Sequence, residues 1–345
     1  MSTETITNKY QAFNFPRLER FLGFLARESV SANSSTVIKS LGIPLLAIGI
    51  FLMLWSVLAA QVQTSLGVLP GPAKVWEQAQ TLYVEHKEQR DKEDAFYERQ
   101  QKRVDKAVAA GKPQEKIDKL QSRKYTGVPT FLDQILTSLI TVAFGFIIGS
   151  IIAIPIGIMC GMSPILYRAF NPIIQIFRPV SPLAWLPLVT MVVSAVYVSQ
   201  DPMFDKSFLT SAITVTLCCL WPTVINTTVG VSGVSRDLLN VSRVLQLGPI
   251  TKTVKIILPA ALPMIFTGLR LSLSIGWMVL IAAEMLAQNP GLGKFVWDEF
   301  QNGSSNSLAR IMVAVLVIGF VGFLLDRGML MLQRYFSWDK NAVLR

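Results

Sequence analysis

Three charged side chains stand inside otherwise apolar stretches of the chain: Arg178, Arg270 and Glu284. Acid–base or nucleophilic catalysis would need a second acid, a histidine or an activated serine or cysteine, and none accompanies them. Arg270 and Glu284 are fourteen residues apart, about 21 Å of rise on a helix, so they cannot pair with each other. We therefore predict no catalytic residue, and a structural role for Arg270 and Glu284 with a separate partner for each.

Arg178 lies in a stretch whose backbone cannot form one regular helix. Prolines at 172, 179, 182 and 187 each remove a backbone donor. Broken backbone at membrane depth is tolerated only where it is buried in protein or lines a water-filled cavity. We therefore predict that this stretch lines a translocation pathway, with Arg178 as the first candidate residue. Trp185, Trp221 and Asn226 are further candidates because they are large or polar residues in apolar spans. A structural role stays open: Arg178 could pair with a carbonyl or an acid, and the tryptophans could serve in packing or interface anchoring.

The elements that would hold these residues are transmembrane helices. With 51% hydrophobic and 16% charged residues, the 345-residue chain is too apolar for a soluble domain of this size. Runs long enough to cross a bilayer, about 20 residues each, cover residues 40–60, 134–167, 179–200 and 207–235, and two further spans cover 256–293 and 311–325. The predicted fold class is all-α, a polytopic membrane protein with six transmembrane helices. The first is an anchor rather than a signal peptide, because 39 mostly polar residues precede it.

Lysine and arginine flank the apolar runs in the N-terminal segment 1–39, in the loop 235–259 and toward the C-terminus, at Arg327, Arg334, Lys340 and Arg345. The positive-inside rule predicts that all three regions, including the tail 336–345, are cytoplasmic, which agrees with six spans and a transmembrane core over 131–335. In a membrane protein, this bias of the cytoplasmic flanks is a simpler cause of a positive net charge, here +10, than a nucleic-acid partner. Membrane lipid is thus an expected partner, whereas nucleic acid is not, since no nucleic-acid motif accompanies the charge.

The connection 61–130 must be external by helix parity, although its charged insert at 81–125 is more basic than acidic. Connections longer than about 60 residues escape the charge rule. The composition of residues 74–124 predicts a long polar helix, a break at 109–113 and a shorter helix. The insert is either a solvated appendage or a docking surface for an external partner. His86 has no neighbouring cysteine or histidine, so no metal site is predicted.

Residues 291–294, Gly-Leu-Gly-Lys, look like part of a phosphate-binding loop but lack its defining positions. Gln288 stands where the first glycine is required, and Phe295 follows the lysine where serine or threonine must bind magnesium. No cofactor is therefore predicted in this chain. If transport is driven by ATP, ATP and magnesium must bind a separate polypeptide.

The loop 235–259 carries a motif that resembles the coupling loop of ABC-importer permeases. That family reads Glu-Ala-Ala, three residues, Gly, nine residues and Ile-x-Leu-Pro, and here residues 256–259 read Ile-Ile-Leu-Pro at the matching spacing. The head departs, with Asn-Val-Ser at 240–242 and Gln246 in place of the glycine, although Gly248 lies two residues on. The resemblance implies contact with an ATPase through Asn240, Val241, Ser242, Arg243, Leu247 and Gly248.

Other runs resemble the nitrate, sulfonate and taurine import group of these type I permeases. They are Phe-Arg-Pro-Val-Ser-Pro-Leu-Ala-Trp at 177–185, Phe-Thr-Gly-Leu-Arg at 266–270, Ala-Ala-Glu-Met-Leu at 282–286 and Gly-Leu-Gly at 291–293. Residues 240–247, 177–182 and 295–298 are most similar to the nitrate and bicarbonate branch. The resemblance covers roughly 36–80 and 126–339 and leaves the insert without a counterpart.

What the resemblance implies is a bacterial inner-membrane importer of a small inorganic anion, nitrate first. It would contain two copies of this permease, two cytoplasmic ATPase subunits and an external substrate-binding protein. A sulfonate, taurine or bicarbonate permease is the alternative within the family. An ATP-independent carrier or channel is the alternative of a different class, with Glu284 as the one membrane carboxylate to take a proton.

Overall fold

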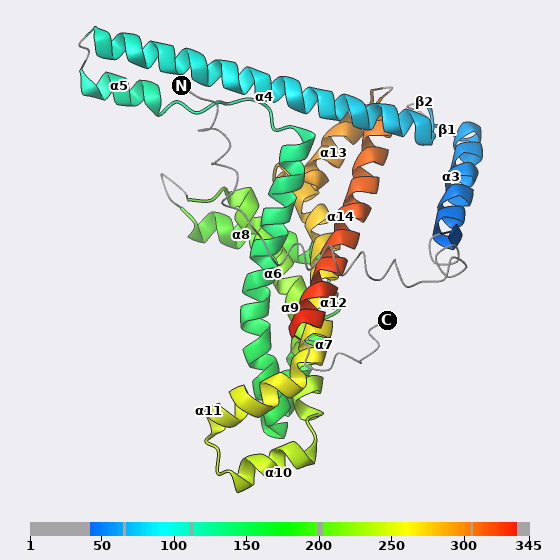
Figure 1. Ribbon diagram of the computed structural model, residues 1–345, viewed down its shortest axis with the longest axis vertical. Helices are drawn as coiled ribbons and strands as arrows, with labels where there is room; N and C mark the ends of the chain where they lie inside the picture. The colour runs from blue at the N-terminus through cyan, green and yellow to red at the C-terminus, as the bar shows by residue number, and fades with distance from the viewer. Residues whose placement is uncertain (1–41, 65–66, 111–112, 199–202, 305, 337–345) are drawn as a thin grey trace, which may run out of the picture. The chain divides into compact units, whose positions relative to one another are not determined.

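The computed structural model describes residues 42–64, 67–110, 113–198, 203–304 and 306–336, which are almost wholly helical (Figure 1). The chain divides after Thr64 into two units. The first contains α3 (Ile43–Gln61) and the two-residue strand β1 (Gln63–Thr64). Ala59 is the one buried residue of α3, whose other described side chains are largely exposed, as expected of a helix that faces lipid. The predicted segment 1–39 and almost all of 336–345 lie outside the described residues.

The second unit begins with the short strand β2 (Gly67–Val68) and continues as a series of helices. These are α4 (Pro72–Ala109), α5 (Gln114–Gln121), α6 (Phe131–Met162), α7 (Pro164–Phe177), α8 (Pro182–Val196), α9 (Lys206–Ser232), α10 (Arg236–Val244), α11 (Pro249–Lys252), the π-helical turn η3 (Thr253–Ile257), α12 (Leu258–Ala287), α13 (Leu292–Asn302) and α14 (Ser307–Phe336). Figure 1 shows α4 crossing the end of the bundle at which α6 and α14 begin, with α10 and α11 at the opposite end.

Five stretches of the described chain are long and apolar enough to cross a membrane: α3, α6, α9, the continuous stretch Pro249–Ala287 and α14. A sixth span exists if the pair α7 and α8, bent by 99° at its break, counts as one. The predicted all-helical polytopic fold is therefore confirmed, with the sixth span supplied by a broken pair. The break falls at 178–181, inside the proline-rich stretch that could not be one regular helix.

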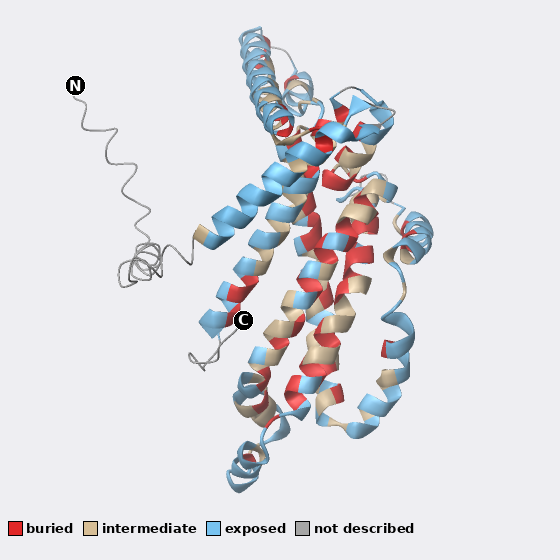
Figure 2. Ribbon diagram, turned by 90° about the vertical axis from the view of Figure 1, so that its right-hand side faces the viewer, coloured by how far each residue is buried: buried red, intermediate tan, exposed pale blue. Residues whose placement is uncertain are grey.

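Close approach of α6, α9 and α12 builds the centre of the bundle, where the buried residues gather in Figure 2. Small residues of α6 recur every four positions. A Cβ added at Gly145 would lie 2.6 Å from the Ala212 carbonyl oxygen, and one added at Gly157 would lie 2.5 Å from Thr227 Cβ. The hydroxyl of Thr216 donates to the Gly145 carbonyl at 3.0 Å. Small residues that admit a neighbouring backbone, with side-chain hydrogen bonds between helices, are the usual means of packing helices in lipid.

Several predicted boundaries are wrong. The apolar run 134–167 is divided at Ser163, whose hydroxyl accepts from the Leu166 N–H and starts α7, so hydropathy alone could not show the break. The span predicted at 256–293 ends at Ala287, because Gln288 adopts a left-handed conformation with φ of 56°. The connection predicted after it contains α13. The last helix extends well beyond 311–325 at both ends and includes Arg310 and Asp326, two charged residues missing from the predicted spans.

The insert has the predicted form of a long helix, a break and a short helix, here α4 and α5. Its first half is attached to the bundle by polar contacts. Arg90 donates to Asp133 at 3.0 Å, and Arg310 forms an ion pair with Glu85. The single histidine, His86, lies 2.6 Å from the Thr130 hydroxyl at the start of α6. The base of the insert is therefore an ordered extension of the bundle.

Candidate functional site

The polar loop between α9 and α12 folds into two short helices, α10 and α11, at one end of the bundle. Ser235 caps α10 by accepting a hydrogen bond from the Leu238 N–H. Asn240, Val241 and Arg243 are exposed, and the Arg243 guanidinium donates to Asn240 Oδ1 at 3.4 Å. Three candidate contact residues thus lie on one accessible helix.

The other three candidates occupy different environments. Ser242 is only 2% exposed and donates to the Leu239 carbonyl at 2.6 Å, so it supports α10 from within. Leu247 is half-buried, and its N–H donates to the Ser242 carbonyl at 3.1 Å. Gly248 is exposed and precedes α11. Sequence reasoning missed the exposed apolar side chains of this loop, which are Leu238, Val244, Leu245, Ile250 and Val254.

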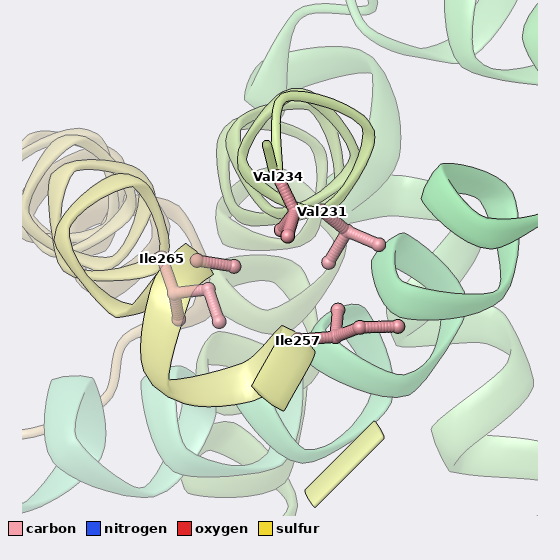
Figure 3. Packing of buried hydrophobic residues seen from close by; sticks show 5 residues of the cluster. Val231, Val234, Ile257 and Ile265 are labelled. Atoms are coloured by element: carbon pink, nitrogen blue, oxygen red, sulfur yellow. The ribbon is translucent and has the colours of Figure 1, made fainter. Parts of the chain in front are cut away.

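An apolar cluster joins both ends of this loop to the bundle. Val231 and Val234 at the end of α9 point toward Ile257 of η3 and toward Ile265 of α12 (Figure 3), and Ala261 completes the cluster. The Ile-Ile-Leu-Pro motif therefore has a physical role: Ile257 is buried, and Pro259 lies at the start of α12. Because Pro259 lacks an N–H, the preceding turn closes with the π-type bond from the Leu258 N–H to the Thr253 carbonyl.

Gln246 departs from the family motif in residue type but keeps a backbone conformation that glycine favours. Its φ is 46°, in the left-handed region that favours glycine. The family motif has glycine at this position. The chain thus keeps the backbone turn that the motif requires while placing a larger side chain on it.

The four predicted pathway residues, Arg178, Trp185, Trp221 and Asn226, line one cavity of about 410 Å³. The break between α7 and α8 forms part of its wall, and the middle turns of α9 and α12 form the rest. None of its lining residues is acidic, and Arg178 makes no ion pair with any described residue. The four residues that were predicted from the sequence as pathway candidates therefore lie close together in space.

Aromatic stacking fixes two walls of this cavity. Phe177, beside the helix break, stacks on Trp185 with ring centroids 5.7 Å apart and on Trp221 at 6.1 Å. The indole N–H of Trp221 is buried and has no hydrogen-bond partner among the described residues. The Asn226 amide already donates to the Pro222 carbonyl at 2.8 Å. The lining of the cavity thus contains a cation and no acid, which suits an anion.

Glu284 is fully buried and joins three helices. Its carboxylate accepts from the Ser138 hydroxyl of α6 at 2.8 Å and from the Gly293 N–H of α13 at 3.0 Å. Ser138 in turn accepts from the Leu292 N–H at 2.9 Å. A Cβ at Gly291 would collide with this carboxylate, so glycine at this position of the Gly-Leu-Gly run allows the loop to approach Glu284.

Arg270 pairs with Asp326 of α14, as expected for a residue whose partner had to lie elsewhere. Its Nη2 donates to Asp326 Oδ2 at 2.9 Å, and its Nε donates to the other oxygen. The sequence prediction missed Asp326, because the last predicted span ends at Leu325. The need of Arg270 for an acidic partner on another helix was the signal that could have extended this span to include Asp326.

The fold and these features define a class: a multi-pass helical membrane subunit with a polar loop at one end and an acid-free cavity between its helices. A family model described as the binding-protein-dependent transport system inner membrane component matches residues 153–336, just over half of the chain. The chain belongs to this family. It is an ABC-importer permease of the inner membrane and is not itself catalytic, since ATP is bound and hydrolysed by partner subunits.

Curated relatives share this assignment and differ in substrate. The chain is 40% identical over 200 residues to the nitrate import permease protein NrtB of Synechocystis, covering 58% of this chain and 68% of that protein. It is 41% identical over 202 residues to the bicarbonate transport system permease protein CmpB of the same organism, covering 58% and 67%. It is 30% identical over 227 residues to the taurine transport system permease protein TauC of Escherichia coli, covering 64% and 77%.

A solved structure supports the fold. A chain of the MetNI methionine ABC transporter in an inward-facing conformation superposes with a TM-score of 0.52 at 15% identity, covering 60% of this chain and 96% of that one. Family membership implies ATPase and binding-protein partners and sets aside the ATP-independent carrier or channel.

Proposed function

We propose that this permease carries nitrate from the periplasm to the cytoplasm, in a complex with a second copy of the chain, two cytoplasmic ATPase subunits and an external binding protein. The observation that carries the proposal is the acid-free cavity lined by Arg178. Arg178 is exposed, and a cation in the lining of a cavity without acids raises the local concentration of anions. Alternating access through this cavity would supply nitrate for assimilation.

The balance of donors and acceptors favours nitrate over bicarbonate. Nitrate only accepts hydrogen bonds, whereas bicarbonate also carries an O–H that needs an acceptor. The side-chain acceptors of the cavity are limited to Asn226 Oδ1 and the weakly accepting sulfurs of Cys218 and Met278. The similarity to nitrate and bicarbonate permeases is nearly equal, so this chemistry makes nitrate the first choice. Bicarbonate is the second, followed by taurine or another sulfonate.

Substrate and pathway are tested together by uptake into proteoliposomes that contain the permease, its ATPase and its binding protein. Labelled nitrate should accumulate with ATP, and unlabelled bicarbonate or taurine in excess should not compete. Arg178→Gln should lower nitrate uptake about tenfold, since a hydrogen bond that involves a charged group contributes about 1.5–3 kcal/mol. The matched control is Arg168→Gln, because Arg168 is an exposed arginine of α7 outside the cavity. Normal nitrate uptake by Arg178→Gln would remove Arg178 from the pathway.

We further propose that α10 and α11 form the contact with the ATPase, on the cytoplasmic side. The exposed pair Asn240 and Arg243, together with the exposed apolar side chains around them, supports this assignment. The apolar cluster of Val231, Val234, Ile257, Ala261 and Ile265 would pass ATPase closure to α9 and α12 as a rigid-body movement.

Charge reversal at Arg243 tests the contact. Arg243→Glu should abolish nitrate uptake while ATP hydrolysis continues and the permease still inserts, because the loop would no longer follow the ATPase. The control is Arg334→Glu, which reverses the charge of an exposed arginine in the last turn of α14, outside the loop. Wild-type uptake and complex assembly in Arg243→Glu would show that the contact lies elsewhere.

A further inference from the structure

The outer half of the insert is a small folded hairpin. Val104 and Ala107 of α4 are buried against Ile117 of α5, and Leu120 packs beside them. The family model begins at residue 153, so the hairpin lies outside the matched region. Membership of the family therefore does not explain what this hairpin does.

The segment that follows α5 is fixed against α4. The Gln100 side-chain amide of α4 donates to the carbonyls of Leu120, Gln121 and Arg123, the last at 2.9 Å. Farther along, the Tyr125 ring lies 5.5 Å from the Phe96 ring. Gln89 donates to the Tyr125 hydroxyl at 2.9 Å. These contacts hold the backbone of Arg123 opposite the middle of α4.

Three arginines meet there around a cavity of about 160 Å³. Its lining consists of Phe96, Arg99, Gln100, Arg103, Leu120 and Arg123, with no carboxylate among them. None of the three arginines forms an ion pair with a described residue. Arg99 donates its Nε to the Ala95 carbonyl at 2.8 Å, which leaves its two terminal nitrogens free to bind.

The three arginines are exposed, and no acidic residue faces them in the cavity. Arg99 and Arg103 are four residues apart on one helix face, a spacing at which like charges repel. Acidic residues are plentiful on α4, yet they occupy other faces: Asp94, Glu98 and Asp105 do not line the cavity. A guanidinium offers a planar fork of donors that matches the oxygens of a phosphate group.

We propose that this arginine pocket binds a phosphate-type oxyanion, either free phosphate or the phosphate of a lipid headgroup. The three guanidinium groups supply the charge and the donors, and Gln100 fixes the segment that carries the third. The volume suits one compact anion. The site is separate from the transport cavity, so it serves as an anion-sensing or anchoring site on the insert and does not depend on the proposed substrate.

The test uses the full-length protein, purified in a maltoside detergent that contains no phosphate. Calorimetric titration with inorganic phosphate should show one saturable site per chain. Arg103→Gln and Arg123→Gln should each weaken binding at least tenfold. Arg103→Lys should lose less, because the charge remains while the fork is lost. The matched control Lys102→Gln removes an equal charge from an exposed neighbour outside the pocket and should bind as wild type.

Two further arms identify the source of the anion and guard against misfolding. A second titration uses dihexanoyl phosphatidic acid; arginine-dependent binding of the lipid alone assigns the pocket to a headgroup, and arginine-dependent binding of inorganic phosphate assigns it to the free ion. Unchanged ATP-driven uptake by the arginine variants shows that they fold. The proposal is overturned if neither probe binds, or if Lys102→Gln loses as much affinity as Arg103→Gln.

Discussion

At the scale of single residues, the charged side chains inside the spans connect neighbouring helices through ion pairs and hydrogen bonds. Arg270 and Asp326 connect α12 to α14, and Glu284 connects α12 to α6 and α13. An unpaired intramembrane charge costs several kcal/mol, whereas a satisfied one fixes the positions of its neighbours. An anionic Glu284 would repel the proposed substrate, which favours the structural role.

Glu284→Gln tests that role. Glutamine has the same shape but carries no charge, and an NH2 group replaces one of the two oxygens within reach of the Ser138 hydroxyl, so the hydrogen bonds that a carboxylate strengthens become weaker and the free energy of unfolding should fall by about 1–3 kcal/mol. Thermal unfolding in detergent measures the loss. Asp298→Asn, which removes a partly exposed ion pair with Lys294, should change stability by about 1 kcal/mol or less. A changed preference among anions in Glu284→Gln would contradict the structural role.

At the scale of elements, the loop between α9 and α12 is a compact unit built on an apolar cluster rather than a flexible connection. Its tightest turn is at Gln246, where a left-handed backbone is carried by a residue with a Cβ. Such a conformation costs roughly 1 kcal/mol for a residue other than glycine. The turn orients α11 relative to α10.

Gln246→Gly should relieve that cost and raise the free energy of unfolding by up to about 1 kcal/mol, less the entropy that glycine adds to the unfolded chain. Gln246→Val should instead destabilise the loop, because a β-branched side chain tolerates positive φ poorly. Thermal unfolding of the two variants side by side, with co-purification of the ATPase as a second readout, measures the difference. Equal behaviour of glycine and valine would mean that the turn is not strained.

At the scale of the whole second unit, the insert and the polar loop lie at opposite ends of the bundle (Figure 1). One end should therefore face the cytoplasm and the other the periplasm. The charge of the loop places it in the cytoplasm by the positive-inside rule, which puts the insert outside even though the insert is itself basic.

A single cysteine at Ala95 tests this orientation, since Ala95 is exposed on α4. In a background that lacks Cys160, Cys218 and Cys219, Ala95→Cys in spheroplasts should react with a membrane-impermeant maleimide applied to the external face. A cysteine at exposed Ser235, the first residue of the loop, should react only after lysis. The reverse pattern would overturn the topology and the assignment of the ATPase contact together.

The sequence by itself determined the class of this protein and most of its local structure. Long apolar runs predict spans because a bilayer sets the length of a helix, and prolines predict the break beside Arg178 because they remove donors. The resemblance of residues 256–259 to a family motif located the loop. Tertiary structure decided the rest. Hydropathy does not show which segments lie close together. Asp326 as the partner of Arg270 and Ser138 as the partner of Glu284 therefore appear only once helices far apart in sequence are packed together. The convergence of Arg123 with Arg99 and Arg103 appears only once the segment after α5 packs against α4.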